Sequence, residues 1–206
     1  MQTGKKTRET LRERRSKKNF SVLSYLDDSE TLRRRGESRV LIVVPMHTYD
    51  AHEFGELNRV LEERGIHSVI ASSTGGVPRS NKGRSMQRFA ELQLEAFDPD
   101  YFDVVFFVGG TVSEFKRELR FQKIEHMLAS AMQNGLCIAA TSDSAKELLD
   151  ISGWSVWLKN VFKDSVRYGR AKDAAGAVLA VKHTSQIATM VEKAMALRAA
   201  NFKHQP

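Results

Sequence analysis

The sequence has little cysteine and no long apolar run: a single cysteine, Cys137, occurs among 206 residues. One cysteine cannot form an internal disulfide and provides no metal-binding spacing, so we expect no metal site and no cofactor. The longest apolar segments, VLIVVPM from Val40 and VVFFV from Val104, are far shorter than the roughly 20 residues of a membrane helix. The charged N-terminal segment is not followed by the apolar stretch of a secretory signal. These absences favour a cytoplasmic protein.

The positive charge is concentrated at the N-terminus. Residues 1–18 hold eight Lys or Arg against two Glu, whereas residues 40–206 carry a net charge of only +1. A basic segment poor in apolar residues cannot bury enough surface to offset its ordering entropy. We therefore expect a basic N-terminal extension over residues 1–37 and an α/β domain over residues 38–206. The extension permits binding of nucleic acid or another anionic partner through residues 1–18, although it has no aromatic residue before Phe20 for base stacking.

From residue 39 onward, short apolar runs alternate with segments of helical periodicity. RVLIVV (39–44) and FDVVFFVGG (102–110) are apolar on both faces, which predicts strands covered on two sides. Between them, EFGELNRVLEERG predicts a helix with Leu57 and Leu61 on one face and a stop at Gly65. The same alternation predicts strands in HSVIAS, LCIAAT and AVLAV, and amphipathic helices around residues 121–132 and 187–195. The pattern is typical of a doubly wound, mainly parallel sheet.

Ligands of such sheets bind beyond the carboxyl ends of the strands, so the residues that follow each strand are the candidates for a site. Polar residues or glycines follow four of the predicted strands: HTYDAHE after the first, Gly109 and Gly110, TSDS at 141–144, and KHTS at 182–185. We expect these segments to converge at one edge of the sheet.

Three segments in this order resemble the PfpI family of the class I glutamine amidotransferase-like superfamily, which includes the parkinsonism-associated deglycase. They are VLIVVPMHTYDAHEFGELNRVLEERGIHSVIAS, FDVVFFVGG and GLCIAATSDSAKELL. The resemblance covers roughly residues 38–200 and implies a flavodoxin-like α/β domain. Relatives are commonly dimers, so it also implies a homodimer.

The resemblance implies a set of site residues. The family's nucleophilic cysteine, on a tight strand-to-helix turn, falls on Ser142, and the histidine that often follows it falls on Asp143. Glu53 matches the acidic residue that hydrogen-bonds the cysteine. Gly109 and Gly110 match the glycine pair whose backbone N–H groups can face a developing oxyanion or a ligand.

A serine nucleophile needs a base, and three histidines are candidates. His183 is the best placed because it follows the last core strand, where amidotransferase relatives carry a histidine followed by proline and glutamate. Here Thr184 and Ser185 follow it, so the orienting acid is missing. His47 and His52, near the first strand, are the other candidates. A surface or capping histidine is the simpler interpretation of each.

Three hypotheses follow, from different classes of protein. We favour a pseudoenzyme, a PfpI-like domain that has lost the family's cysteine chemistry and serves as a binding, regulatory or assembly module. The alternative is a hydrolase or transferase with Ser142 as nucleophile, His183 or a loop histidine as base, Glu53 or Asp143 in support, and the glycine pair as the oxyanion site. In the third hypothesis, the domain is a scaffold that presents the basic extension to nucleic acid or a large assembly. Fold alone does not choose among them, because function depends on the site.

Overall fold

The computed structural model divides the chain into two units, Met1–Glu37 and Ser38–Pro206, and all the residues that it describes belong to the second. The described residues are 39–86, 88–96, 101–110, 135–141, 144, 167–169, 177–181 and 183–202. The expected basic extension and the amphipathic helix expected around residues 121–132 lie outside them. So do Ser142 and Asp143.

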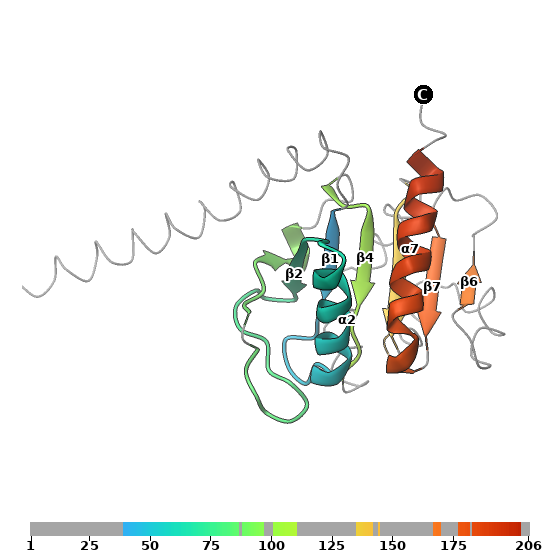
Figure 1. Cartoon of the computed structure of the whole chain (residues 1–206). Helices are drawn as coiled ribbons and strands as arrows, with labels where there is room; N and C mark the ends of the chain where they lie inside the picture. The colour runs from blue at the N-terminus through green and yellow to red at the C-terminus, as the bar shows by residue number, and fades with distance from the viewer. Residues whose placement is uncertain are drawn as a thin grey trace, which may run out of the picture. The chain divides into compact units, whose positions relative to one another are not determined.

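A seven-stranded sheet with the order β3-β2-β1-β4-β5-β7-β6 forms the centre of the domain (Figure 1). Its strands are β1 (Val40–Val43), β2 (Ser68–Ser72), β3 (Leu92–Gln93), β4 (Val104–Phe107), β5 (Cys137–Thr141), β6 (Arg167–Gly169) and β7 (Ala177–Val181). All neighbouring strands are parallel except β6, which pairs antiparallel with β7. The chain runs outward from β1 to β3 and then returns to β4 on the other side of β1. This reversal between β1 and β4 confirms the predicted doubly wound, mainly parallel sheet.

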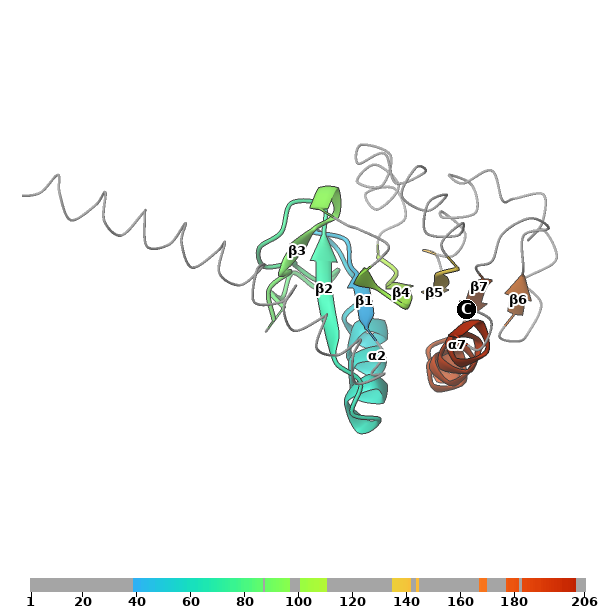
Figure 2. The same cartoon turned by 90° about the horizontal axis from the view of Figure 1, so that it is seen from above.

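Two helices, α2 (Ala51–Glu63) and α7 (Ile187–Phe202), pack side by side on the same face of the sheet (Figure 2). Helix α2 begins where the Asp50 side chain accepts hydrogen bonds from the N–H groups of His52 (2.8 Å) and Glu53 (3.0 Å). Such a cap satisfies donors that have no partner within the helix. Beyond its last turn, Gly65 has a φ of 65°, which favours glycine. The helix predicted after the first strand is therefore confirmed. Two short 3-10 turns, Leu94–Ala96 and Thr184–Gln186, lie elsewhere in the domain.

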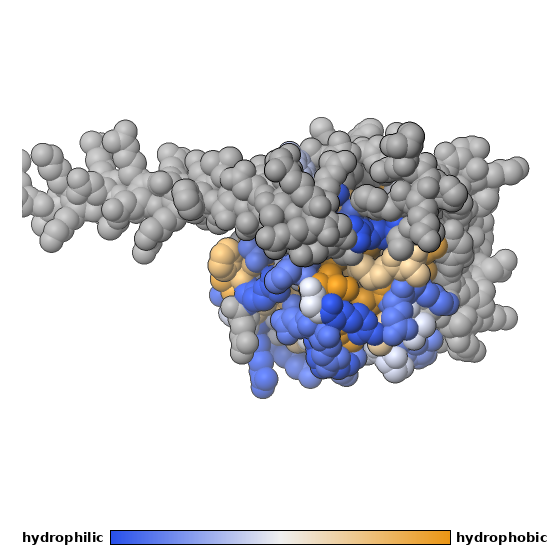
Figure 3. Space-filling view, turned by 45° about the horizontal axis from the view of Figure 1, so that its top comes forward, coloured by the Kyte–Doolittle hydropathy of each residue, from blue (hydrophilic) through white to orange (hydrophobic). Residues whose placement is uncertain are grey.

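The central strands are buried on both faces, as the apolar runs predict. Val40 and Ile42 pack in one cluster with Leu57 of α2 and Met190 of α7, whereas Leu41, on the opposite face of β1, is just as fully buried. The described surface is largely hydrophilic on the face drawn in Figure 3. No helix among the described residues is long and apolar enough to cross a membrane.

Candidate functional site

The carboxyl ends of β1, β4 and β5 meet beside the first turn of α2. The parallel register aligns Val43 with Phe107 and Phe107 with Ala140, so the three strands end at the same edge. The loop after β1 also contacts the glycine pair: Asp50 N donates to Gly109 O over 2.7 Å, and Tyr49 forms an antiparallel bridge with Gly110. The switch point of the sheet, where the strand order reverses between β1 and β4, is therefore lined by residues from three separate segments of the chain.

A buried carboxylate lies at this point. Glu53, in the first turn of α2, is only 6% exposed, and its Oε2 accepts a hydrogen bond from Gly109 N (3.0 Å). The Thr141 hydroxyl donates a short hydrogen bond to the same oxygen. Gly109 N also lies 3.0 Å from Thr141 Oγ1, so the three groups form a closed triangle, which we call the Glu53 triangle. Thr141 is 1% exposed, and within the described residues no cationic side chain pairs with Glu53.

The two glycines are required by close approaches. A Cβ added at Gly109 would lie 2.7 Å from Glu53 Oε2, so any other residue at this position would displace the carboxylate from its present place. A Cβ at Gly110 would lie 2.7 Å from Thr48 O and 2.8 Å from Pro45 Cγ. Thr48 itself has a φ of 67°, which is uncommon for a β-branched residue. The loop after β1 thus packs tightly on the glycine pair.

Of the residues that the sequence proposes for the site, the structure brings Glu53 and Gly109 into direct contact. The Gly109 N–H is engaged by Glu53 and Thr141, so the role of the glycine pair as an oxyanion site stays a prediction. Ser142 and Asp143 lie outside the described residues, and their assigned roles stay predictions as well.

The candidate histidines are exposed. His183 begins the 3-10 turn after β7, and its N–H donates to Gln186 Oε1 over 3.2 Å. Among the described residues, no hydrogen bond joins its imidazole to Glu53 or Thr141. His52 is exposed at the start of α2, and His47 is exposed in the loop after β1. The described part of the chain also holds no cluster of three or more His, Cys, Asp or Glu side chains that could bind a metal ion.

Thr141 is the site residue that the sequence interpretation missed. The family motif pointed to Ser142, the residue after Thr141. The alternation of side chains along the strand was the signal that could have identified Thr141. In β5, Cys137, Ala139 and Thr141 share a face by the two-residue period, and Cys137 and Ala139 belong to the cluster beneath α2 and α7. Glu53 lies in the first turn of α2, over the end of that same face.

Two further groups near β5 are held inside the domain. The Ser144 hydroxyl lies 2.5 Å from Thr141 O and 3.0 Å from Phe107 O, so it links the ends of β4 and β5.

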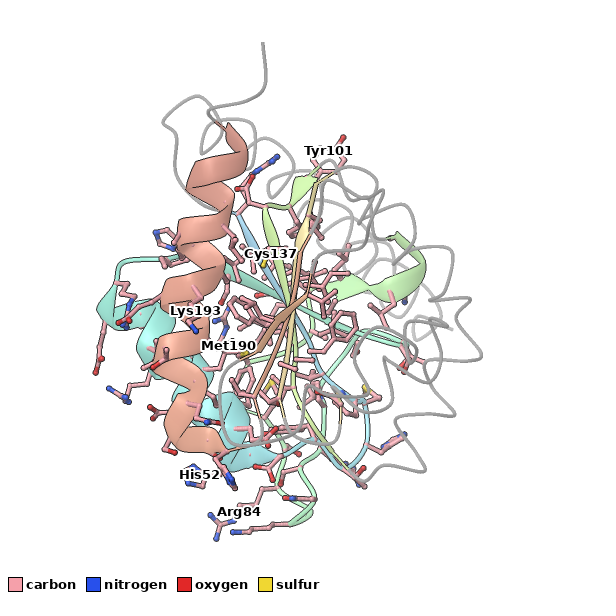
Figure 4. All side chains as sticks on the ribbon, turned by 90° about the vertical axis from the view of Figure 1, so that its right-hand side faces the viewer. His52, Arg84, Tyr101, Cys137, Met190 and Lys193 are labelled. Atoms are coloured by element: carbon pink, nitrogen blue, oxygen red, sulfur yellow. The ribbon has the colours of Figure 1, made fainter. Side chains whose placement is uncertain are left out.

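Cys137 lies among packed side chains at the other end of β5 (Figure 4). Burial raises the pKa of its thiol to about 12, because a thiolate would lose its hydration there.

An open, mainly parallel α/β sheet with polar groups at the switch point defines a class of flavodoxin-like domains whose ligands bind at this edge. The model of the DJ-1/PfpI family matches residues 38–153, and the chain belongs to this family.

Several solved structures have the same fold. A ThiJ/PfpI domain protein from Brachyspira murdochii superposes with a TM-score of 0.61 at 14% identity, covering 80% of this chain and 98% of that one. Oxidized DJ-1 from Toxoplasma gondii gives a TM-score of 0.60 at 16% identity, with 81% and 95% covered. DJ-1beta from Drosophila melanogaster gives 0.57 at 20% identity, with 81% and 98% covered. At these identities the likeness shows the fold alone. None of the curated proteins matches the chain.

Proposed function

We propose that this DJ-1/PfpI domain carries out no thiol chemistry and acts as a binding, regulatory or assembly module. The Glu53 triangle is the observation that carries the proposal. The resemblance implies that the acid at position 53 hydrogen-bonds a cysteine, and here its partner is the Thr141 hydroxyl. A hydroxyl is far less acidic than a thiol and needs a base to become a nucleophile. With Thr141 1% exposed, the triangle links α2, β4 and β5 and leaves little room for a reacting molecule.

The one thiol of the chain does not replace the missing nucleophile. Cys137 is buried within β5, and its pKa of about 12 leaves only about one molecule in ten thousand as thiolate at pH 8. The thiolate is the reactive form, so the wild-type chain should resist alkylation until it unfolds.

The proposal also includes the location, oligomeric state and partner of the module. We place the protein in the cytoplasm as a homodimer, as the sequence and the family resemblance imply. In this proposal, residues 1–18 act as an electrostatic tether for an anionic partner. Exposed charges are screened within roughly 8–10 Å at physiological salt, so binding through the tether should weaken steeply as salt is added.

The test is an esterase and amidase screen of the wild type beside Thr141→Val and Ser142→Ala, with p-nitrophenyl acetate and a chromogenic amide as substrates. We expect all three proteins to hydrolyse both substrates at the same background rate. Thr74→Val, at an exposed threonine, is the matched control for the loss of a hydroxyl. Circular dichroism confirms that each variant is folded.

Two results would overturn the proposal, and they are distinguishable. Turnover by the wild type that disappears in Ser142→Ala would establish the serine-dependent hydrolase. Turnover that disappears in Thr141→Val but survives in Ser142→Ala would place the chemistry in the Glu53 triangle instead.

A further inference from the structure

A short β-arm leaves the domain between β2 and β3. It comprises residues 76–86 and 88–90, and two antiparallel bridges, Gly76 with Ala90 and Arg79 with Ser85, hold its two sides together. At its tip, Ser80 N donates to Arg84 O and Gly83 N donates to Ser80 O, each over 2.8 Å. We call this segment the arm.

The arm is fixed to the loop that precedes α2. Tyr49 N donates to Arg79 O (3.1 Å), and Asn81 N donates to Tyr49 O (2.9 Å), which forms a short parallel bridge beside the glycine pair. Ser80 and Met86, both within the arm, are buried. Because its backbone is already ordered by these hydrogen bonds, the arm would lose little conformational entropy on binding a partner.

The charges of the arm are all of one sign. No Asp or Glu occurs between Glu63 and Glu91. Three cations of the arm, Arg79, Lys82 and Arg84, are exposed, and in the described part of the chain none of them takes part in an ion pair. Figure 4 shows Arg84 at the same end of the domain as His52 of α2, in keeping with the contact between Asn81 and Tyr49.

Three other surface arginines among the described residues pair with acidic side chains. Arg59 pairs with Glu56 and Glu63, and Arg64 pairs with Glu192. Arg88, on the returning side of the arm, contacts Glu91 and also donates to Ser68 O over 2.8 Å. The three cations near the tip therefore differ from these arginines in forming no ion pair within the described residues, although Asn81 of the tip donates to Asp50 Oδ2 over 3.4 Å.

The arm also exposes two large apolar side chains. Val77 is 47% exposed and Phe89 is 56% exposed; Val77 directly follows Gly76 and Phe89 directly precedes Ala90, so they lie on opposite sides of the arm next to the bridge between Gly76 and Ala90. The exposed phenyl ring and the exposed cations therefore lie on the same arm, and packing in the core does not explain a phenyl ring of this exposure.

We propose that the arm binds single-stranded nucleic acid, with Arg79, Lys82 and Arg84 contacting phosphates and Phe89 stacking on a base. Proteins that bind single strands combine a cationic track along the backbone with aromatic side chains on which the bases stack. An acidic protein surface would use the cations but not the ring. The proposal is independent of the Glu53 triangle, because it uses none of its residues.

The experiment measures the fluorescence anisotropy of a labelled 20-nucleotide poly(U) bound to the full chain between 50 and 300 mM KCl. Each phosphate contact to a single strand contributes about 0.7 to the slope of log K against log salt. The triple variant Arg79→Gln, Lys82→Gln, Arg84→Gln should therefore lower the magnitude of that slope by about 2. The remaining slope reports the basic extension, which all variants retain.

Single substitutions separate the ring from the charges. Phe89→Ala should weaken binding roughly tenfold at every salt concentration with the slope unchanged, and Phe89→Trp should retain the affinity, because any aromatic face can stack. Lys82→Gln should lower the slope by about 0.7. Lys193→Gln is the matched control for Lys82→Gln, because Lys193 is also exposed but lies on α7 (Figure 4). It should leave the slope unchanged.

Three results would overturn the proposal. Unchanged affinity and slope in the triple variant would show that the arm does not contact the strand. Equal losses in Lys82→Gln and Lys193→Gln would show that only the total charge matters. Competition by poly-glutamate as effective as that by unlabelled poly(U), together with no effect of Phe89→Ala, would identify the arm as a site for an acidic protein.

Discussion

Two carboxylates are buried near opposite ends of the sheet, and their surroundings differ. Asp103, just before β4, is 9% exposed and lies 3.2 Å from the Arg39 guanidinium and 3.4 Å from Nε of Arg198 on α7. It also accepts a hydrogen bond from Arg39 N over 2.8 Å. Glu53, at the carboxyl end, meets a hydroxyl and a backbone amide, and no cation within the described residues.

The difference shows what each carboxylate does for the protein. A buried acid between two guanidinium groups balances charge, and here it also connects the starts of β1 and β4 to α7. A buried acid with only neutral donors gains no such compensation, so hydrogen bonds alone offset the cost of burying it. We interpret the first as structural, whereas the second belongs to the candidate site at the carboxyl ends of the strands.

The largest effect expected from this comparison is at Asp103. Asp103→Asn should lower the free energy of unfolding by about 3 kcal/mol, because the buried Arg39 and the partly buried Arg198 lose the carboxylate between them. Urea unfolding at pH 7 measures this as a lower midpoint with an unchanged m-value. A loss below about 1 kcal/mol would contradict the structural role.

A second test concerns the close packing around the glycine pair. Gly110→Ala should cost about 2 kcal/mol, because the new Cβ would meet the backbone oxygen of Thr48 at 2.7 Å, and a backbone atom cannot move aside easily. Gly55→Ala is the matched control, since nothing lies within 4 Å of its Cβ position. In the exposed face of α2 it should stabilise the protein by about 0.5–1 kcal/mol. Thermal unfolding of both variants measures the contrast.

The smallest effect is expected at Glu53. Glu53→Gln keeps a carbonyl oxygen for Gly109 N and Thr141 and removes the charge, so we expect a change of about 1 kcal/mol or less in the free energy of unfolding. Urea unfolding beside Asp103→Asn measures the difference. A cost equal to that of Asp103→Asn would remove the distinction between the two carboxylates.

The sequence predicted the central fold because burial leaves a clear periodic record. The doubly apolar run of β1, the amphipathic α2 and the glycine that follows α2 specified strand, helix and stop from local residues alone. The short edge strands β3 and β6 were not predicted, since two or three residues show no period and pair only because a neighbouring edge is available.

For the site, the sequence by itself determined that Glu53 and the glycine pair belong to the edge of a parallel sheet. Only the tertiary structure decided that the partner of Glu53 is Thr141, which lies 88 residues further along the chain. That contact depends on the register of β5 against β4 and on the height of α2 above the sheet. Both arise from packing between distant segments, and no local spacing of residues encodes them.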